Sequence, residues 1–239
     1  MESKKVSVIL PTYNEKENIE ELIRQIYFYC RKDLFEVIVV DDNSPDGTWK
    51  IVRNLQKKYK TLRLCRRINE KGLPSAIWAG IGQAKGNIVV WLDCDLSHPP
   101  KIIPKLIEHI PQYDIVCASR YVENGKDNRA FMRVLPSKLI SIFAGIILGL
   151  KIKDVTSGFY AVKKVVFSKI HLMKTGYAEY CIRFSYEASK KGFKIKEIGY
   201  VFTDREKGYS KTFSNLGSFL HNGYLCFKEI IKLRMEGLL

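Results

Sequence analysis

The sequence predicts an α/β fold with a mostly parallel, Rossmann-like sheet flanked by helices. Short apolar runs alternate with amphipathic patterns through the first half of the chain, which is typical of βαβ units. Clusters of polar residues follow three of the apolar runs, at positions 12–15, 41–46 and 93–98. Ligands bind beyond the carboxyl ends of the strands in such sheets, so the three clusters predict one shared crevice.

The first half contains five expected strands and four expected helices. A capped amphipathic helix is expected after Asn14, since Glu17 follows it and apolar residues recur with helical spacing from Ile19 to Ile26. The expected strands are 6–10, 36–40, 62–66, 88–92 and 115–119. The other expected helices are 48–58, 74–84 and 102–110.

The second half alternates less regularly. We expect an apolar helix over 135–150, a turn at 154–158 and a strand over 159–162. A helix over 177–190, a strand over 195–202 and a charged loop over 203–212 follow. The chain therefore divides into one catalytic domain, 1–215, and a C-terminal amphipathic helix within 216–239.

The composition favours a folded protein with an anionic partner. The chain has 40 Lys and Arg against 25 acidic residues, a net charge of +15, which suits nucleic acid, a phosphorylated substrate or an anionic membrane. No RNA- or DNA-binding module is recognisable, so we expect no nucleic acid. The six cysteines form no CxxC pair, and this pattern favours a reducing, cytoplasmic location. The four histidines suggest no zinc site. His98, beside two prolines, is interpreted as structural.

The strongest chemical signal is the pair Asp93 and Asp95 at the end of the apolar run 88–92. In an extended chain alternate residues face the same side, so both carboxylates can point at one ion. Mg²⁺ and Mn²⁺ prefer oxygen ligands such as carboxylates and substrate phosphates. A metal there would stabilise the charge of a departing diphosphate. By itself a DxD motif is equally compatible with solvated or capping acidic residues.

Seven segments, in order along the chain, resemble the family 2 inverting glycosyltransferases with the GT-A fold. Within that family the chain is similar to the polyprenyl-phosphate glycosyltransferases, such as the dolichol-phosphate mannose synthases. The segments are LPTYNE (10–15), VDDNSPDGT (40–48), KGL (71–73), DCDLSHPP (93–100), SRY (119–121), DVTSGF (154–159) and DREKGYSK (204–211).

The resemblance implies roles for individual positions. Asp93 and Asp95 would bind Mg²⁺ or Mn²⁺ and the donor diphosphate, with Ser97 as a third metal position that acts through water. The positions implied to contact the base and ribose of a nucleotide-sugar are Pro11, Tyr13, Glu15, Val39 and Asp41. The positions implied to bind the acceptor phosphate or the sugar are Arg120, Arg133, Ser137, Arg205 and Lys211.

Each role has an ordinary alternative. Tyr13 could be a packed aromatic, and Asp41 could cap a turn, which is the preferred interpretation of Asp42. The segment 130–137 departs from the basic pattern of the family, so Arg133 could be a surface arginine.

A phosphate acceptor changes what the site must do. A phosphate monoester is largely dianionic at pH 7, since its second pKa is near 6, so the attack needs positioning and charge rather than a general base. Asp154 would then orient a sugar hydroxyl or an arginine. With an alcohol acceptor it would become the candidate base, and it could also simply cap the turn at 156–158.

A polyprenyl acceptor places the enzyme at a membrane. The longest uncharged apolar run, 139–150, is shorter than the roughly 20 residues of a membrane span, and no signal peptide is recognisable, so we expect a peripheral protein on the cytoplasmic face. Segments 138–151 and 219–234 would dock at the interface or pack against the core or a partner subunit; a membrane-anchoring partner protein stays open. The expected activity is transfer of mannose from GDP-mannose to dolichyl phosphate. The alternatives are UDP-glucose or UDP-N-acetylglucosamine as donor, or a sugar or protein hydroxyl as acceptor.

Overall fold

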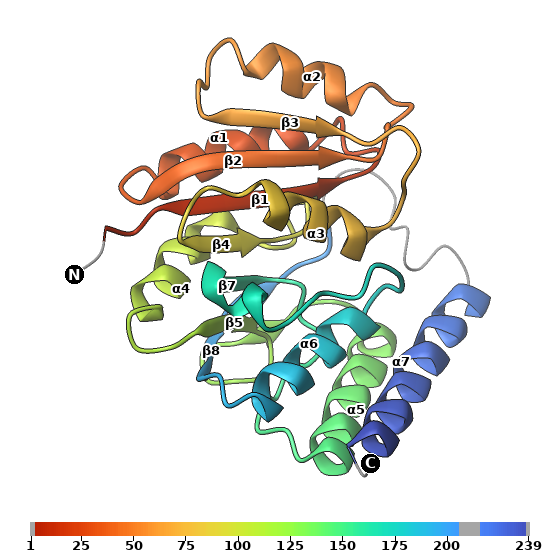
Figure 1. The fold of residues 1–239 in the computed structure, drawn as a ribbon. Helices are drawn as coiled ribbons and strands as arrows, with labels where there is room; N and C mark the ends of the chain where they lie inside the picture. Colours follow the sequence, from red (N-terminus) through yellow and green to blue (C-terminus); the bar gives the residue numbers. More distant parts are fainter. Residues whose placement is uncertain (1–2, 206–215, 238–239) are drawn as a thin grey trace.

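The computed structural model describes residues 3–205 and 216–237. A seven-stranded sheet has the order β3-β2-β1-β4-β7-β5-β8, and its strands are parallel except β7, which runs antiparallel to both β4 and β5 (Figure 1). The strands are β1 (Val6–Thr12), β2 (Leu34–Asp41), β3 (Leu62–Arg66), β4 (Ile88–Trp91), β5 (Ile115–Ser119), β7 (Tyr160–Lys163) and β8 (Ile195–Gly199). The predicted α/β fold is confirmed.

Helices cover both faces of the sheet. One apolar core joins the sheet to α1 (Ile19–Tyr29), α2 (Thr48–Leu55) and α4 (Ile103–His109), which continues a short 3₁₀ turn at Pro100–Ile102. The opposite core joins it to α3 (Leu73–Gln83), the 3₁₀ helix Lys164–Ser168 and α6 (Glu179–Lys190). The inner strands β1, β2, β4 and β5 are buried on both faces for this reason, which is why they read as largely apolar runs in the sequence. The edge strands β3 and β8 also carry charged residues.

The expected strand over 195–202 is interrupted. β8 ends at Gly199, and after Tyr200 a separate strand, β9 (Val201–Phe202), pairs with β6 (Lys126–Asp127). β6 has only two residues, too few for a periodic pattern in the sequence. The prediction of one strand is wrong here because the chain changes partner, from β5 to β6.

Two further helices form a layer beside α6. α5 (Phe131–Leu148) and α7 (Leu216–Glu236) lie side by side (Figure 1), and Phe143 stacks on Phe227 with ring centroids 5.0 Å apart. Arg183 of α6 forms ion pairs with two residues of α7, with Glu229 at 2.5 Å and with Glu236 at 3.1 Å. A third apolar core fills the space between these three helices.

The α5 helix begins four residues earlier than expected and has 18 residues. Among the described residues it is the one helix long and apolar enough to cross a membrane, by length and composition alone. Its Ser137 hydroxyl lies 3.0 Å from that of Thr156, which attaches it to the domain. The expectation that no segment is long enough to span a membrane is wrong for this helix, because the helix extends beyond the uncharged run 139–150.

Candidate active site

A cavity of about 960 Å³ opens at the carboxyl ends of β1 and β4 and extends to α5 and α7. One end is lined by acidic side chains from the strand ends, Glu15, Asp93 and Asp95. The other end is apolar, with Leu139 from α5 and Phe227 from α7 on its wall. The predicted shared crevice is therefore present, and it joins a polar compartment to an apolar one.

The acidic pair lies just beyond β4, which ends at Trp91. The chain turns at Cys94 and Asp95, and Leu96 follows in the left-handed region with a φ of 66°. The expected strand end is confirmed, but the expectation of an extended chain through Asp93 and Asp95 is wrong, because the chain turns at Cys94 and Asp95. The turn still brings both side chains to the cavity wall.

Asp95 is held by neighbours on both of its oxygens. Ser97 donates to Oδ1 from its backbone N at 3.1 Å and its Oγ at 2.5 Å, and Arg205 donates to Oδ2 at 2.7 Å. Burial would raise the pKa of Asp95, but the Ser97 hydrogen bonds and the Arg205 charge outweigh it and lower that pKa. Asp95 is therefore a carboxylate at neutral pH, and Ser97 acts on it directly.

Arg205 lies at the polar end of the cavity, on the acidic side chains. Besides Asp95 it contacts Glu15 Oε1 at 3.5 Å. The resemblance implies that Arg205 binds a substrate phosphate, yet here its guanidinium neutralises the carboxylates that a metal would use. Lys211, its predicted companion, lies outside the described residues.

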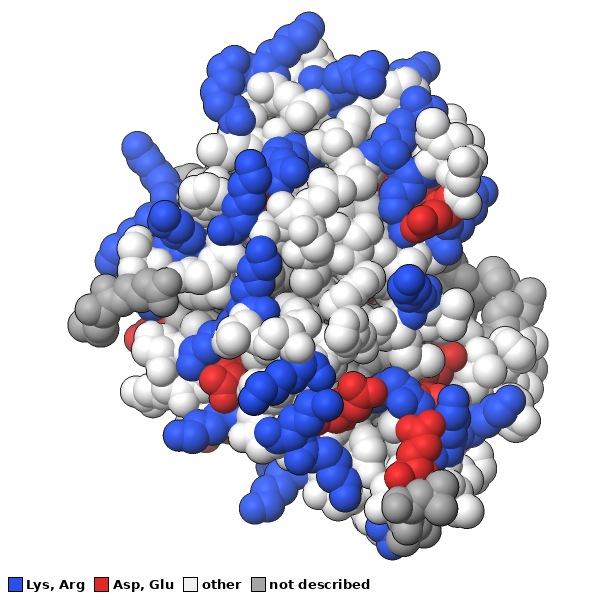
Figure 2. Space-filling view, in the orientation of Figure 1, with Lys and Arg blue, Asp and Glu red and all other residues white. Residues whose placement is uncertain are grey.

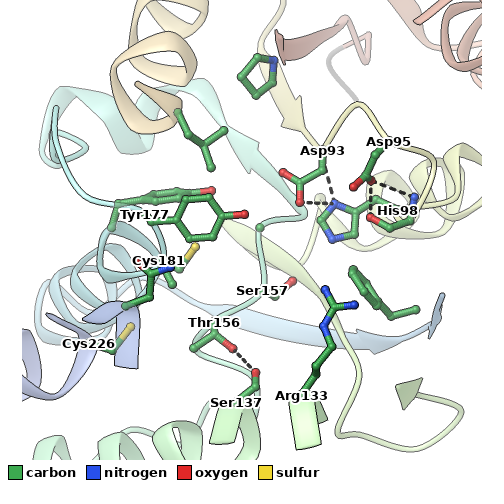
Figure 3. Close-up of a pocket in the computed structure, with 18 of the residues that line it drawn as sticks. Asp93, Asp95, His98, Arg133, Ser137, Thr156, Ser157, Tyr177, Cys181 and Cys226 are labelled. Carbon is green, nitrogen blue, oxygen red and sulfur yellow. Dashed lines mark hydrogen bonds and ion pairs between the residues drawn. The ribbon is translucent and has the colours of Figure 1, made fainter. Parts of the chain in front are cut away.

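His98 closes the acidic turn (Figure 3). Its Nδ1 accepts a hydrogen bond from the backbone N–H of Asp93 at 3.0 Å, and its ring stacks on Phe159 at 5.3 Å. Burial lowers the pKa of His98 to about 4, although the charge of Asp95 opposes this, so the imidazole is neutral at pH 7.

The predicted nucleotide contacts divide into two groups. Pro11, Tyr13 and Glu15 line the cavity. Val39 and Asp41 are completely buried and do not line it. The Asp41 carboxylate accepts hydrogen bonds from the backbone N and Oγ of Ser44, at 2.8 and 2.7 Å, as in the alternative interpretation of a turn cap.

Asp42, interpreted from the sequence as a turn residue, lines the cavity instead. Its Oδ1 accepts from Arg67 Nε at 2.7 Å, and its Oδ2 accepts from the backbone N of Gly72 at 2.8 Å. Arg67 also donates to the Gly72 carbonyl at 3.1 Å. The pair fixes the loop so that Lys71 Nζ lies 5.3 Å from the Tyr13 ring centroid, over its face. No sequence signal identified Arg67, because its partners are 25 and 5 residues away.

Arg120, Asp154 and Ser137 lie close together. Arg120 donates to both oxygens of Asp154, at 2.8 and 2.6 Å, and to Thr156 Oγ1 at 2.8 Å, beside Ser137. Burial alone would lower the pKa of the Arg120 guanidinium, but the charge and hydrogen bonds of Asp154 raise it well above its ordinary value. Asp154 has no exposed surface and does not line the cavity, so it orients Arg120 rather than facing a ligand.

Two further arginines reach the cavity wall. Arg133 of α5 makes a partly exposed ion pair with Asp204 at 2.8 Å. Arg129, which the sequence reasoning missed, is bound by both oxygens of Asp127 at 2.8 and 2.6 Å. Its place depends on the short β6–β9 pairing, which leaves no periodic trace in the sequence.

The donor set at the acidic turn suits a hard divalent cation. Asp93 and Asp95 supply carboxylate oxygens at the cavity wall, the ligand type that Mg²⁺ and Mn²⁺ prefer. No group of three or more His, Cys, Asp or Glu able to hold a metal occurs within 3–205 and 216–237. An ion held by two carboxylates would complete its coordination with water and substrate phosphates, as Mg²⁺ commonly does. Arg205 already supplies a positive charge to Asp95, which indicates that this position favours a cation.

A mostly parallel sheet with an acidic pair at its carboxyl edge, beside a cavity of this size, is the arrangement of the GT-A fold. The chain belongs to glycosyl transferase family 2, whose model matches residues 7–171.

Two curated relatives show the similarity in detail. The chain is 43% identical over 215 residues to a dolichol-phosphate mannosyltransferase of Pyrococcus furiosus, covering 87% of this chain and 59% of that protein. It is 33% identical over 212 residues to a polyprenol monophosphomannose synthase of Mycolicibacterium smegmatis, covering 85% of this chain and 79% of the relative. The chain thus spans less than two thirds of the length of the Pyrococcus protein.

Among solved structures, glucosyl-3-phosphoglycerate synthase from Mycobacterium tuberculosis has the same fold. Its complex with Mn²⁺, UDP and phosphoglyceric acid superposes with a TM-score of 0.74 at 18% identity, covering 97% of this chain and 78% of the other. A second complex of that enzyme contains Mg²⁺ and UDP.

Proposed function

We propose that this chain transfers mannose from GDP-mannose to a polyprenyl phosphate such as dolichyl phosphate, with inversion and with Mg²⁺ or Mn²⁺. The observation that carries the proposal is the single cavity with a carboxylate-lined end at β1 and β4 and an apolar end between α5 and α7. A nucleotide-sugar with its metal suits the first end and an isoprenoid chain suits the second. The names of the two curated relatives support the same substrates.

At the donor end, Asp93 and Asp95 would hold the metal, with Ser97 contributing through water. A bound metal would stabilise the charge of the departing nucleoside diphosphate. Pro11, Tyr13 and Glu15, which line the cavity, would contact the nucleoside. Val39 and Asp41 would act through the backbone of β2, since both side chains are buried.

At the acceptor end, we assign the phosphate to the region of Arg120, Arg133 and Ser137. Arg120 is already balanced by Asp154, whereas the Arg133–Asp204 pair is partly exposed. Exposed ion pairs contribute little to stability, so a phosphate dianion can replace Asp204 as the partner of Arg133 at small cost. The dianion needs no general base. The buried position of Asp154 supports a phosphate acceptor over a sugar or protein hydroxyl.

The acceptor lipid requires contact with a membrane, and the surface beside the cavity suits one. The exposed apolar side chains of α5 and α7 form an apolar face, made up of Phe131, Met132, Leu135, Leu139, Ile142, Ile146, Leu220, Tyr224, Phe227, Ile231 and Met235. The net charge of +15 favours an anionic leaflet, and Figure 2 shows Lys and Arg outnumbering acidic residues on the face it displays. We therefore propose peripheral binding to the cytoplasmic face of a membrane, through these helices or with the help of an anchoring partner protein.

The direct test is transfer of labelled sugar to dolichyl phosphate from a panel of GDP-mannose, UDP-glucose and UDP-N-acetylglucosamine, with and without EDTA. We expect a lipid-linked product from GDP-mannose that disappears with EDTA. A product from a UDP-sugar instead would replace the donor in this proposal. Absence of a metal-dependent lipid-linked product with every donor would exclude it.

A further inference from the structure

The acidic turn is held in shape by the side chain of His98, which is not one of the two carboxylates proposed to bind a metal. β4 ends at Trp91, so the backbone N–H of Asp93 has left the hydrogen-bond ladder of the sheet. His98 Nδ1, five residues later, accepts that N–H at 3.0 Å (Figure 3). The bond closes a six-residue loop, 93–98, that contains both carboxylates. An N–H withdrawn from water without a partner is costly, so this partly buried bond stabilises the shape of the loop together with the Ser97–Asp95 hydrogen bonds.

The geometry of the bond also decides the proton on the imidazole. A nitrogen that accepts an N–H cannot carry a proton of its own, so Nδ1 is bare and the neutral ring carries its proton on Nε2. Nδ1 lies 3.8 Å from Asp93 Oδ2.

The ring is fixed on its other sides by aromatic packing. Phe159 stacks against it at 5.3 Å and 26°, and Tyr200 and Phe202 meet it edge-on at 5.8 and 5.4 Å. Phe159 directly precedes β7, Tyr200 lies between β8 and β9, and Phe202 ends β9, so distant parts of the chain fix the position of the ring. The charged groups facing it are Asp93 and Asp95 on its own loop, and Arg120, Arg129 and Asp154 from the neighbouring segments.

We propose that His98 is a positioning residue for the metal site: its bare Nδ1 fixes the Asp93 backbone and thereby the direction of both carboxylates. The inference rests on the proposed function, since it assumes a metal at Asp93 and Asp95. Groups that orient metal ligands typically change metal affinity by roughly 10- to 100-fold when removed. His98 acts in this way on the main chain of a ligand, and Ser97 acts on the side chain of the other.

Two substitutions separate positioning from packing. H98F keeps the ring and its stacking but has no acceptor for the Asp93 N–H. H98N loses the ring, yet its Oδ1 is attached where Nδ1 was and can accept the same bond. F159L is the matched packing control, because Phe159 stacks on the His98 ring but is not the acceptor of the Asp93 N–H.

The measurement is the Kd of Mn²⁺ in the presence of GDP, followed by the EPR signal of free Mn²⁺, alongside thermal unfolding. We expect H98F to weaken Mn²⁺ binding roughly 10- to 100-fold while staying folded, and H98N and F159L to stay within about threefold of wild type although both are less stable. A purely structural role predicts the reverse order, with H98N and F159L weaker than H98F, and would overturn the inference. Equal affinity of H98F and wild type would overturn it as well. If wild type binds no Mn²⁺ with GDP or UDP, the proposed function itself fails, which is a distinguishable result.

Discussion

The substitution D154N tests whether Asp154 is a support for Arg120 or a reacting group. Asp154 is fully buried and accepts three hydrogen bonds from Arg120, at 2.9, 2.8 and 2.6 Å. Asn keeps the size but loses the charge and turns one acceptor into a donor that faces the guanidinium. The nearest other carboxylate is Asp127, at 3.5 Å from Arg120 and already bonded by Arg129.

The size of the effect follows from this burial. Removing one partner of a buried ion pair costs roughly 3–5 kcal/mol, and partial compensation by Asp127 favours the lower end, about 3 kcal/mol. For a chain of this length each kcal/mol lowers Tm by roughly 2–4 °C, so we expect a fall of ~6–12 °C. The assay is urea and thermal unfolding followed by circular dichroism, at the pH used for transfer.

Two controls make the result interpretable. D204N removes the partner of the exposed Arg133 and should cost less than about 1 kcal/mol. The double variant R120M/D154L replaces the buried pair with apolar side chains and should be more stable than D154N, because no charge is left uncompensated. If D154N unfolds within about 2 °C of wild type but transfers no sugar, Asp154 takes part in the chemistry and the reasoning is refuted.

Three further predictions follow from the same geometry. As the pH of metal-free buffer falls from 6.5 to about 4, His98 takes up a proton in the unfolded chain before it does so in the folded chain. The free energy of unfolding should therefore fall by up to roughly 3 kcal/mol. In urea titrations, H98F should lack this part of the pH dependence. R205M should bind Mn²⁺ without nucleotide roughly 3- to 10-fold more tightly than wild type, because Arg205 neutralises Asp95. Its rate of sugar transfer should fall. Weaker Mn²⁺ binding by R205M in the same EPR assay would contradict this role of Arg205. I146E, on the apolar face of α5, should weaken sedimentation with phosphatidylserine-containing vesicles by about tenfold. V165E, at a position that is also exposed but lies outside that face, should not weaken it. Equal losses in the two variants would exclude α5 as the docking surface.

The sequence predicted the sheet well because its signals are local. Strands 62–66 and 115–119 agree with β3 and β5 residue for residue. The segment 115–119 is a buried apolar run, and 62–66 mixes apolar and basic residues at the edge of the sheet. The three polar clusters meet at one cavity as expected, because parallel strands place their carboxyl ends at one edge. For α7 the sequence left open whether its apolar face docks at an interface or packs against the core, and the structure divides that face: Leu233 is buried against α5 and α6, whereas Leu220 is exposed. Periodicity does not show which part of a broad apolar face meets the protein.

The sequence by itself determined that Asp93 and Asp95 follow a buried strand, and that basic residues are available for phosphate. Only the tertiary structure decided what each side chain touches. It paired Arg205 with Asp95 and Arg120 with Asp154, and it gave Asp41 a hydrogen bond from Ser44. It also assigned the buried His98 to the Asp93 backbone. The physical reason is that a buried charge or hydrogen-bonding group must find a partner, and chain folding, more than residue type, decides which partner is within reach.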